Sequence, residues 1–154
     1  VYAHPDYIST LDKSTAIADH VPVDFELRGC PISQQQLLEL VTSLLHQKQP
    51  RTPSHSVCLE CKRRGTVCVA VARGIACMGP VTQAGCGAIC PSFNRECFGC
   101  FGPQEQVNLA SLANHYRQQG STPKQLVRLT RNFNGYAEGF REVSDSLTQG
   151  NSDT

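Results

Sequence analysis

The sequence of 154 residues has no tryptophan, a single methionine and only 6% aromatic residues. Its 14 basic and 13 acidic residues give a formal net charge of +1, which argues against general attraction to nucleic acid or an anionic membrane. No apolar run approaches the roughly 18 residues that a membrane span needs. The first residues lack the basic and apolar segments of a signal peptide. The length suits one small domain, or a small domain with part of another.

Cysteine, in contrast, is abundant, with nine residues. Cys30 stands alone, and the other eight crowd into one segment: Cys58, Cys61, Cys68, Cys77, Cys86, Cys90, Cys97 and Cys100. That segment is rich in glycine and proline and poor in long apolar side chains, so it cannot bury enough surface to offset the entropy of ordering. Disulfides, zinc or iron–sulfur clusters must therefore hold it together.

The eight clustered cysteines divide in order into two quartets. The first runs C-x2-C-x6-C-x8-C from Cys58 to Cys77, and the second runs C-x3-C-x6-C-x2-C from Cys86 to Cys100. A Cys-x2-Cys pair places two sulfurs on one side of a tight loop, and glycines let backbone amides point at sulfur. Two complete quartets predict two metal centres.

The spacing favours iron–sulfur clusters over the alternatives. A disulfide scaffold needs an even cysteine count in a secreted protein, and the count is odd. Structural zinc sites usually combine two short knuckles with a longer spacer, a pattern that neither quartet shows. Zinc nevertheless stays open, as does a redox-active Cys-x2-Cys pair. No arrangement of catalytic residues for chemistry on a substrate is apparent.

The segment before the quartets predicts part of an α/β domain. Apolar residues alternate with polar ones from Val21 to Leu27, which is typical of a half-buried strand. Ser33 and Gln36 form a capping box for a helix that runs to about residue 47. Cys30 then lies at the carboxyl end of the strand, where such sheets place their sites.

Four regions follow from these patterns. Residues 1–50 are predicted to be the remnant of an α/β domain, and residues 51–104 an irregular two-centre domain. Residues 105–148 are predicted to be carboxyl-terminal helices, because Thr122 and Pro123 make an N-cap pair and apolar residues recur at helical spacing from Tyr136 to Leu147. Residues 149–154 are expected to be a disordered end.

Several motifs together resemble the small subunit of nickel–iron hydrogenases. They are Gly29-Cys30-Pro31, Cys58-Leu-Glu-Cys61, Cys77-Met-Gly-Pro-Val-Thr-Gln-Ala-Gly-Cys86 and Cys97-Phe-Gly-Cys100-Phe-Gly-Pro103. The similarity is to the cytoplasmic branch: the sulfhydrogenase delta subunit, the NADP-linked or F420-non-reducing type, and the NADH:ubiquinone oxidoreductase 20 kDa subunit-like family. It covers roughly residues 20–145, that is, the carboxyl-terminal part of such a subunit.

The resemblance implies a cofactor for each group of cysteines. The distal 4Fe–4S cluster would be bound by Cys58, Cys61, Cys68 and Cys77. The medial 4Fe–4S cluster would be bound by Cys86, Cys90, Cys97 and Cys100. Cys30 would be one of four ligands to a third, proximal 4Fe–4S cluster, and the other three lie in the family's flavodoxin-like amino-terminal domain. Residues 1–50 would be the last strand and helix of that domain.

The resemblance also implies a function and partners. The chain would be a cytoplasmic electron-transfer subunit in a hetero-oligomer, without a substrate-converting site of its own. It would relay electrons between the nickel–iron large subunit and a flavin- and iron–sulfur-containing diaphorase, or heterodisulfide- or sulfur-reducing subunits. Two other functions remain open: a zinc-stabilised interaction module, and a stand-alone ferredoxin-like carrier.

Overall fold

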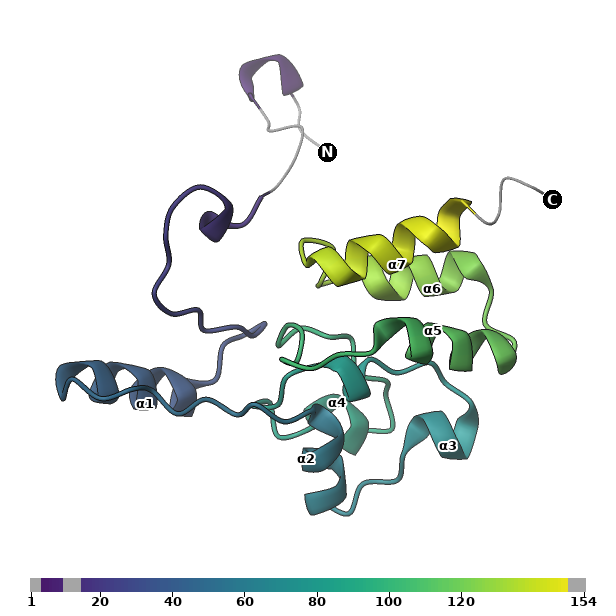
Figure 1. Cartoon of the computed structure of the whole chain (residues 1–154), viewed down its shortest axis with the longest axis horizontal. Coiled ribbons are helices and arrows are strands. Elements are labelled where there is room, and N and C mark those ends of the chain that lie inside the picture. Colours follow the sequence, from purple (N-terminus) through teal and green to yellow (C-terminus); the bar gives the residue numbers. More distant parts are fainter. Residues whose placement is uncertain (1–3, 10–14, 150–154) are drawn as a thin grey trace.

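The structure is a computed structural model that describes residues 4–9 and 15–149. In these ranges the chain forms helices and long loops, with two isolated β-bridges, Ser56 to Gln83 and Thr82 to Pro103. The α-helices are α1 (Gln34–Leu45), α2 (Val57–Arg63), α3 (Val69–Arg73), α4 (Ile89–Ser92), α5 (Leu109–Gln118), α6 (Pro123–Arg131) and α7 (Glu138–Gln149). The 3-10 helices are η1 (Pro5–Tyr7), η2 (Ile17–Asp19) and η3 (Gly79–Val81). In Figure 1, α1 projects from a body in which α5, α6 and α7 are stacked over the cysteine-rich loops.

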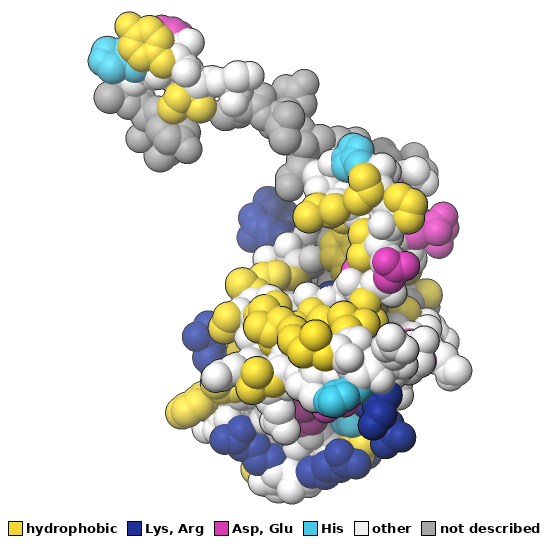
Figure 2. Space-filling view, turned by 90° about the vertical axis from the view of Figure 1, so that its left-hand side faces the viewer, with side chains coloured by type: hydrophobic (Ala, Val, Ile, Leu, Met, Phe, Trp, Pro, Cys, Tyr) yellow, Lys and Arg dark blue, Asp and Glu magenta, His cyan; other side chains and the backbone are white. Residues whose placement is uncertain are grey.

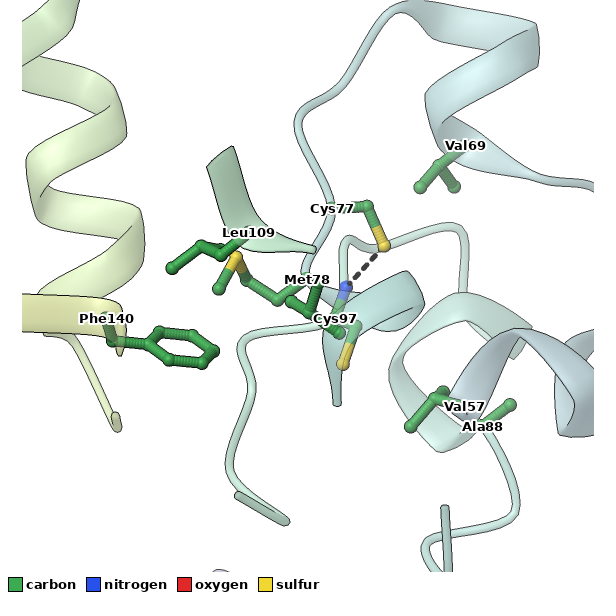
Figure 3. Close-up of a cluster of buried hydrophobic side chains, with 9 residues drawn as sticks. Val57, Val69, Cys77, Met78, Ala88, Cys97, Leu109 and Phe140 are labelled. Carbon is green, nitrogen blue, oxygen red and sulfur yellow. Dashed lines mark hydrogen bonds between the residues drawn. The ribbon is translucent and has the colours of Figure 1, made fainter. Parts of the chain in front are cut away.

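The core lies between the cysteine-rich segment and the carboxyl-terminal helices. Met78 is fully buried, and its side chain lies near those of Leu109 and Phe140 (Figure 3). Val57 at the start of α2 and Val81 in η3 belong to the same cluster. This core is small, as expected for a segment with few long apolar side chains. Cys77 and Cys97 are buried within it, so the core and the cysteine sites share residues.

The predicted carboxyl-terminal helices are confirmed. Thr122 caps α6, its hydroxyl accepting a hydrogen bond from the Gln125 amide at 3.3 Å, and the Gln125 side chain completes a capping box. Helices α6 and α7 lie side by side (Figure 1). Arg131 joins them by donating to the Ser144 hydroxyl at 2.6 Å and pairing with Asp145. Of the expected disordered end, Gln149 closes α7 and the other residues lie outside the described ranges.

The strand expected from Val21 to Leu27 is wrong as a strand in this structure: the segment is extended and irregular. A strand needs a neighbour to pair its backbone amides and carbonyls, and the described residues offer this segment none. The helix that follows is confirmed, because α1 begins after Ser33, whose hydroxyl accepts from the Gln36 amide. The flavodoxin-like origin of residues 1–50 stays a prediction.

Helix α1 keeps its apolar stripe in solvent. Its large side chains are between 39% and 78% exposed: Leu37, Leu38, Val41, Leu44 and Leu45. Figure 2, which views the side toward which α1 projects, shows hydrophobic side chains gathered on this face. In the described ranges, no helix combines the length and apolar character needed to cross a membrane.

Candidate metal centres

The first quartet is assembled by two short helices and one buried loop. Cys58 and Cys61 lie one turn apart on α2, Cys68 is the N-cap of α3, and Cys77 precedes η3. Burial, with smaller contributions from the nearby Cys77, Cys61 and Cys68, raises the pKa of the Cys58 thiol to about 11. The four thiols are therefore close enough to act on one another electrostatically.

Gly79 keeps open the space between two of these sulfurs. A Cβ atom on Gly79 would lie 3.3 Å from Cys58 Sγ and 3.5 Å from Cys77 Sγ. The Cys97 amide donates to Cys77 Sγ at 3.2 Å, drawn as a dashed line in Figure 3. Burial raises the pKa of Cys77, while the amides of Cys97 and Gly79 oppose the rise. Amides aimed at sulfur stabilise a thiolate, the form that binds metal.

The second quartet lines a single cavity of about 290 Å³. The cavity brings together the thiols of Cys86, Cys90, Cys97 and Cys100. Phe98 and Phe101 contribute apolar walls to it. The sequence prediction that these four cysteines share one site agrees with this placement, although the ligand they hold is not thereby identified.

Hydrogen-bond donors also point at the sulfurs of the second quartet. Burial raises the pKa of Cys97 to about 12, and the Gly99 amide and Thr82 hydroxyl lower it. Burial likewise raises the pKa of Cys86, opposed by the amides of Ala88 and Ile89. Gly99 has φ +87°, a left-handed conformation that suits glycine in the tight Cys-x2-Cys turn. Each of these donors stabilises the thiolate over the thiol.

Cys30 lies at the same cavity as the second quartet. It is exposed, and its backbone amide lowers the pKa of the neighbouring Cys100 thiol, which burial raises. In the described ranges it has no further cysteine of a third set beside it, because the other eight belong to the two quartets. Its assignment to a proximal cluster remains a prediction.

The donor chemistry fits a thiolate-bound centre at each quartet. All nine cysteines lie in the described ranges, and all are free thiols rather than disulfides. Over residues 4–9 and 15–149, no three Cys, His, Asp or Glu side chains are already arranged to hold a single ion. Open space at Gly79, a cavity at the second quartet and amides directed at sulfur are the features that fit a larger thiolate-bound group.

Sequence patterns alone did not identify the residues that support these cysteines. Tyr116 on α5 binds the backbone of Cys77 twice, donating from its hydroxyl to the carbonyl at 2.7 Å and accepting from the amide at 3.0 Å. The Asn134 side chain donates to the Gly99 carbonyl at 3.2 Å, within the second Cys-x2-Cys loop. Helical spacing marked Tyr116 as a core residue, but nothing local links it to a cysteine 39 positions away.

Comparison with known proteins found similar hydrogenase subunits. The chain is 38% identical over 96 residues to the delta subunit of sulfhydrogenase 2 of Pyrococcus furiosus, covering 62% of this chain and 40% of that protein. It is 32% identical over 108 residues to a vhu subunit of the F420-non-reducing hydrogenase of Methanocaldococcus jannaschii, covering 58% and 37%. It is 29% identical over 121 residues to the iron-sulfur subunit of the F420-non-reducing hydrogenase of Archaeoglobus profundus, covering 60% and 37%.

The similarity supports the coarse part of the resemblance, a hydrogenase iron–sulfur subunit. The matched residues amount to about two fifths of the length of each of these curated relatives. No protein-family model matches the chain.

Proposed function

We propose that this chain is the cluster-binding part of an electron-transfer subunit of a nickel–iron hydrogenase. The observation that carries the proposal is the grouping of eight free thiols into two sites, each supplied with hydrogen-bond donors to sulfur. The named relatives are hydrogenase subunits, one of them an iron-sulfur subunit, which supports the same function. The proposal places the complex in the cytoplasm.

In this function each quartet would hold one 4Fe–4S cluster, the first at Cys58, Cys61, Cys68 and Cys77 and the second at Cys86, Cys90, Cys97 and Cys100. When bound, the clusters would supply one-electron carriers. The chain's own contribution is to fix the thiolates, to direct amides at sulfur and to keep water away with Phe98, Phe101 and Met78. Cys30 would add one ligand to a third cluster completed outside this chain.

The metal content of the full chain tests the proposal. Anaerobically purified or reconstituted protein should contain about eight iron and eight acid-labile sulfide per chain, and give EPR signals of reduced clusters. About two zinc ions without sulfide would instead establish the zinc-stabilised module. Colour gives the same distinction quickly, since zinc proteins are colourless.

The proposed partners are the nickel–iron large subunit and a diaphorase, heterodisulfide-reducing or sulfur-reducing subunit. The exposed apolar stripe of α1 supports assembly with other chains, because a solvent-facing stripe of this kind is typical of an interaction surface. Co-expression of the tagged chain with the large subunit from its own organism should yield a nickel-containing complex. A chain that remains monomeric and reducible by itself would indicate a stand-alone ferredoxin-like carrier.

A further inference from the structure

Glu60 on α2 belongs in sequence to the first quartet but contacts the second. It lies between Cys58 and Cys61, yet its carboxylate accepts hydrogen bonds from the Gly85 amide at 2.9 Å and the Ala88 amide at 3.1 Å. These two residues flank Cys86, the first cysteine of the second quartet. The other carboxylate contact is with Cys86 itself, whose Sγ lies 3.8 Å from Oε2.

A second side chain of the same helix end holds the same turn. Arg64, the C-cap of α2, donates from its guanidinium to the Gly87 carbonyl at 2.8 Å. The turn needs such support, because Ala88 has φ +53°, a left-handed conformation that is uncommon for a residue with a side chain. Amides on one side and a carbonyl on the other are therefore fixed by α2, which also carries two thiols of the first quartet.

We propose that Glu60 is a positioning residue that couples the two cysteine sites and lowers the reduction potential of the cluster at the second site. The inference rests on the proposed function. Two observations carry it: the carboxylate holds both amides around Cys86, and it lies against the sulfur of that residue.

The sign of the effect follows from charge. Reduction adds one negative charge to a thiolate-bound cluster, and a carboxylate a few ångströms from one of its sulfurs opposes that addition. Glu60 is only partly exposed, so water screens the interaction incompletely. The Arg64 guanidinium acts in the opposite sense, but it reaches Gly87 rather than the sulfur. The net effect of the carboxylate is a cluster that is harder to reduce.

Glu60→Gln tests the charge in the full chain, reconstituted with ferrous iron and sulfide. Glutamine keeps the length and one amide-accepting oxygen but removes the charge. At a fixed potential, the ratio of reduced to oxidised second cluster should rise about tenfold, which equals about 59 mV for a one-electron couple. An EPR-monitored redox titration measures the ratio, and the signal that disappears in Cys90→Ser identifies the second cluster.

Two further variants separate charge from structure. Glu60→Asp keeps the charge but is one methylene shorter, so the second cluster should stay within about threefold of the wild-type ratio while its iron is lost more readily to a chelator. Glu105→Gln removes an equal charge from an exposed position outside both quartets, and should leave the titration unchanged.

The outcomes distinguish this inference from the proposed function. Wild-type protein with two clusters, and a Glu60→Gln titration that overlays it, would overturn the role of Glu60 alone. An equal shift in Glu105→Gln or in Glu60→Asp would overturn it as well. Wild-type protein that binds zinc without sulfide would overturn both, and the iron and sulfide analysis reveals that case before any titration.

Discussion

At the scale of single residues, the most constrained position is a glycine between two sulfurs. An alanine at Gly79 would place its Cβ 3.3 Å from Cys58 Sγ and 3.5 Å from Cys77 Sγ, tighter than most real contacts in the first case. We therefore expect Gly79→Ala to lose the metal of the first quartet, about half of the total iron. Iron and sulfide analysis measures the loss.

Gly139 provides the matched control for this substitution. It lies in α7, and a Cβ there would meet nothing within 4 Å. Gly139→Ala should keep the full metal content and stabilise α7 by up to about 1 kcal/mol, because glycine is a poor helix former. Full iron in Gly79→Ala would contradict the assigned role of Gly79 as the residue that keeps this space open.

A second prediction at this scale concerns Tyr116. Its hydroxyl satisfies both the amide and the carbonyl of Cys77, and the side chain is 2% exposed. Tyr116→Phe leaves these two backbone groups without that partner in the interior, so the free energy of unfolding should fall by about 1–3 kcal/mol. Urea unfolding of the metal-free protein measures it. Tyr7→Phe, at a residue 85% exposed, should change nothing; an equal loss there would rule out the buried hydrogen bonds as the cause.

At the scale of elements, stability is unevenly divided. Helices α6 and α7 pack through Leu126 and Leu147 and are joined by Arg131, so they have contacts that need no metal. Residues 57–103 depend on a small core that shares Cys77 and Cys97 with the sites. Removing the metal should therefore release the second region first.

Hydrogen exchange tests this division. After chelation, amides of residues 57–103 should exchange much faster, whereas those of α6 and α7 should keep most of their protection. Circular dichroism should record a partial loss of helix under the same conditions. Unchanged exchange in residues 57–103 would mean that packing alone holds the cysteine-rich segment.

The elements also explain what the sequence could and could not predict. Helix α6 was predictable because its signals, Thr122, Pro123 and Gln125, are local. The expected strand at Val21–Leu27 failed because strand formation depends on a partner segment, which alternation within one segment cannot report. Spacing grouped the cysteines, but the contacts of Glu60 and Tyr116 link residues 25 to 39 positions apart. Such contacts follow from the path of the loops and leave no periodic signal.

At the scale of the whole molecule, the buried thiols make stability depend on pH in the metal-free state. An unperturbed thiol has a pKa of 9.0, whereas the folded chain raises that of Cys58 to about 11 and that of Cys97 to about 12. The unfolded chain therefore loses these protons first as pH rises. The stabilisation is complete below pH 9 and is lost between about pH 9 and 12.

Each such thiol should contribute a slope of up to about 1.4 kcal/mol per pH unit within that window. Tyr116, with its pKa raised to about 12 by burial, adds to the slope above pH 10. Urea unfolding of reduced, chelated protein at pH 8 and pH 10.5 measures the effect, and Cys97→Ala should flatten it. In the metal-loaded protein these thiols are already deprotonated in the folded state, so the unfolded chain gives up no more protons than the folded one and the decline should disappear. Equal stability of the metal-free protein at both pH values would show that the thiols do not remain buried without metal.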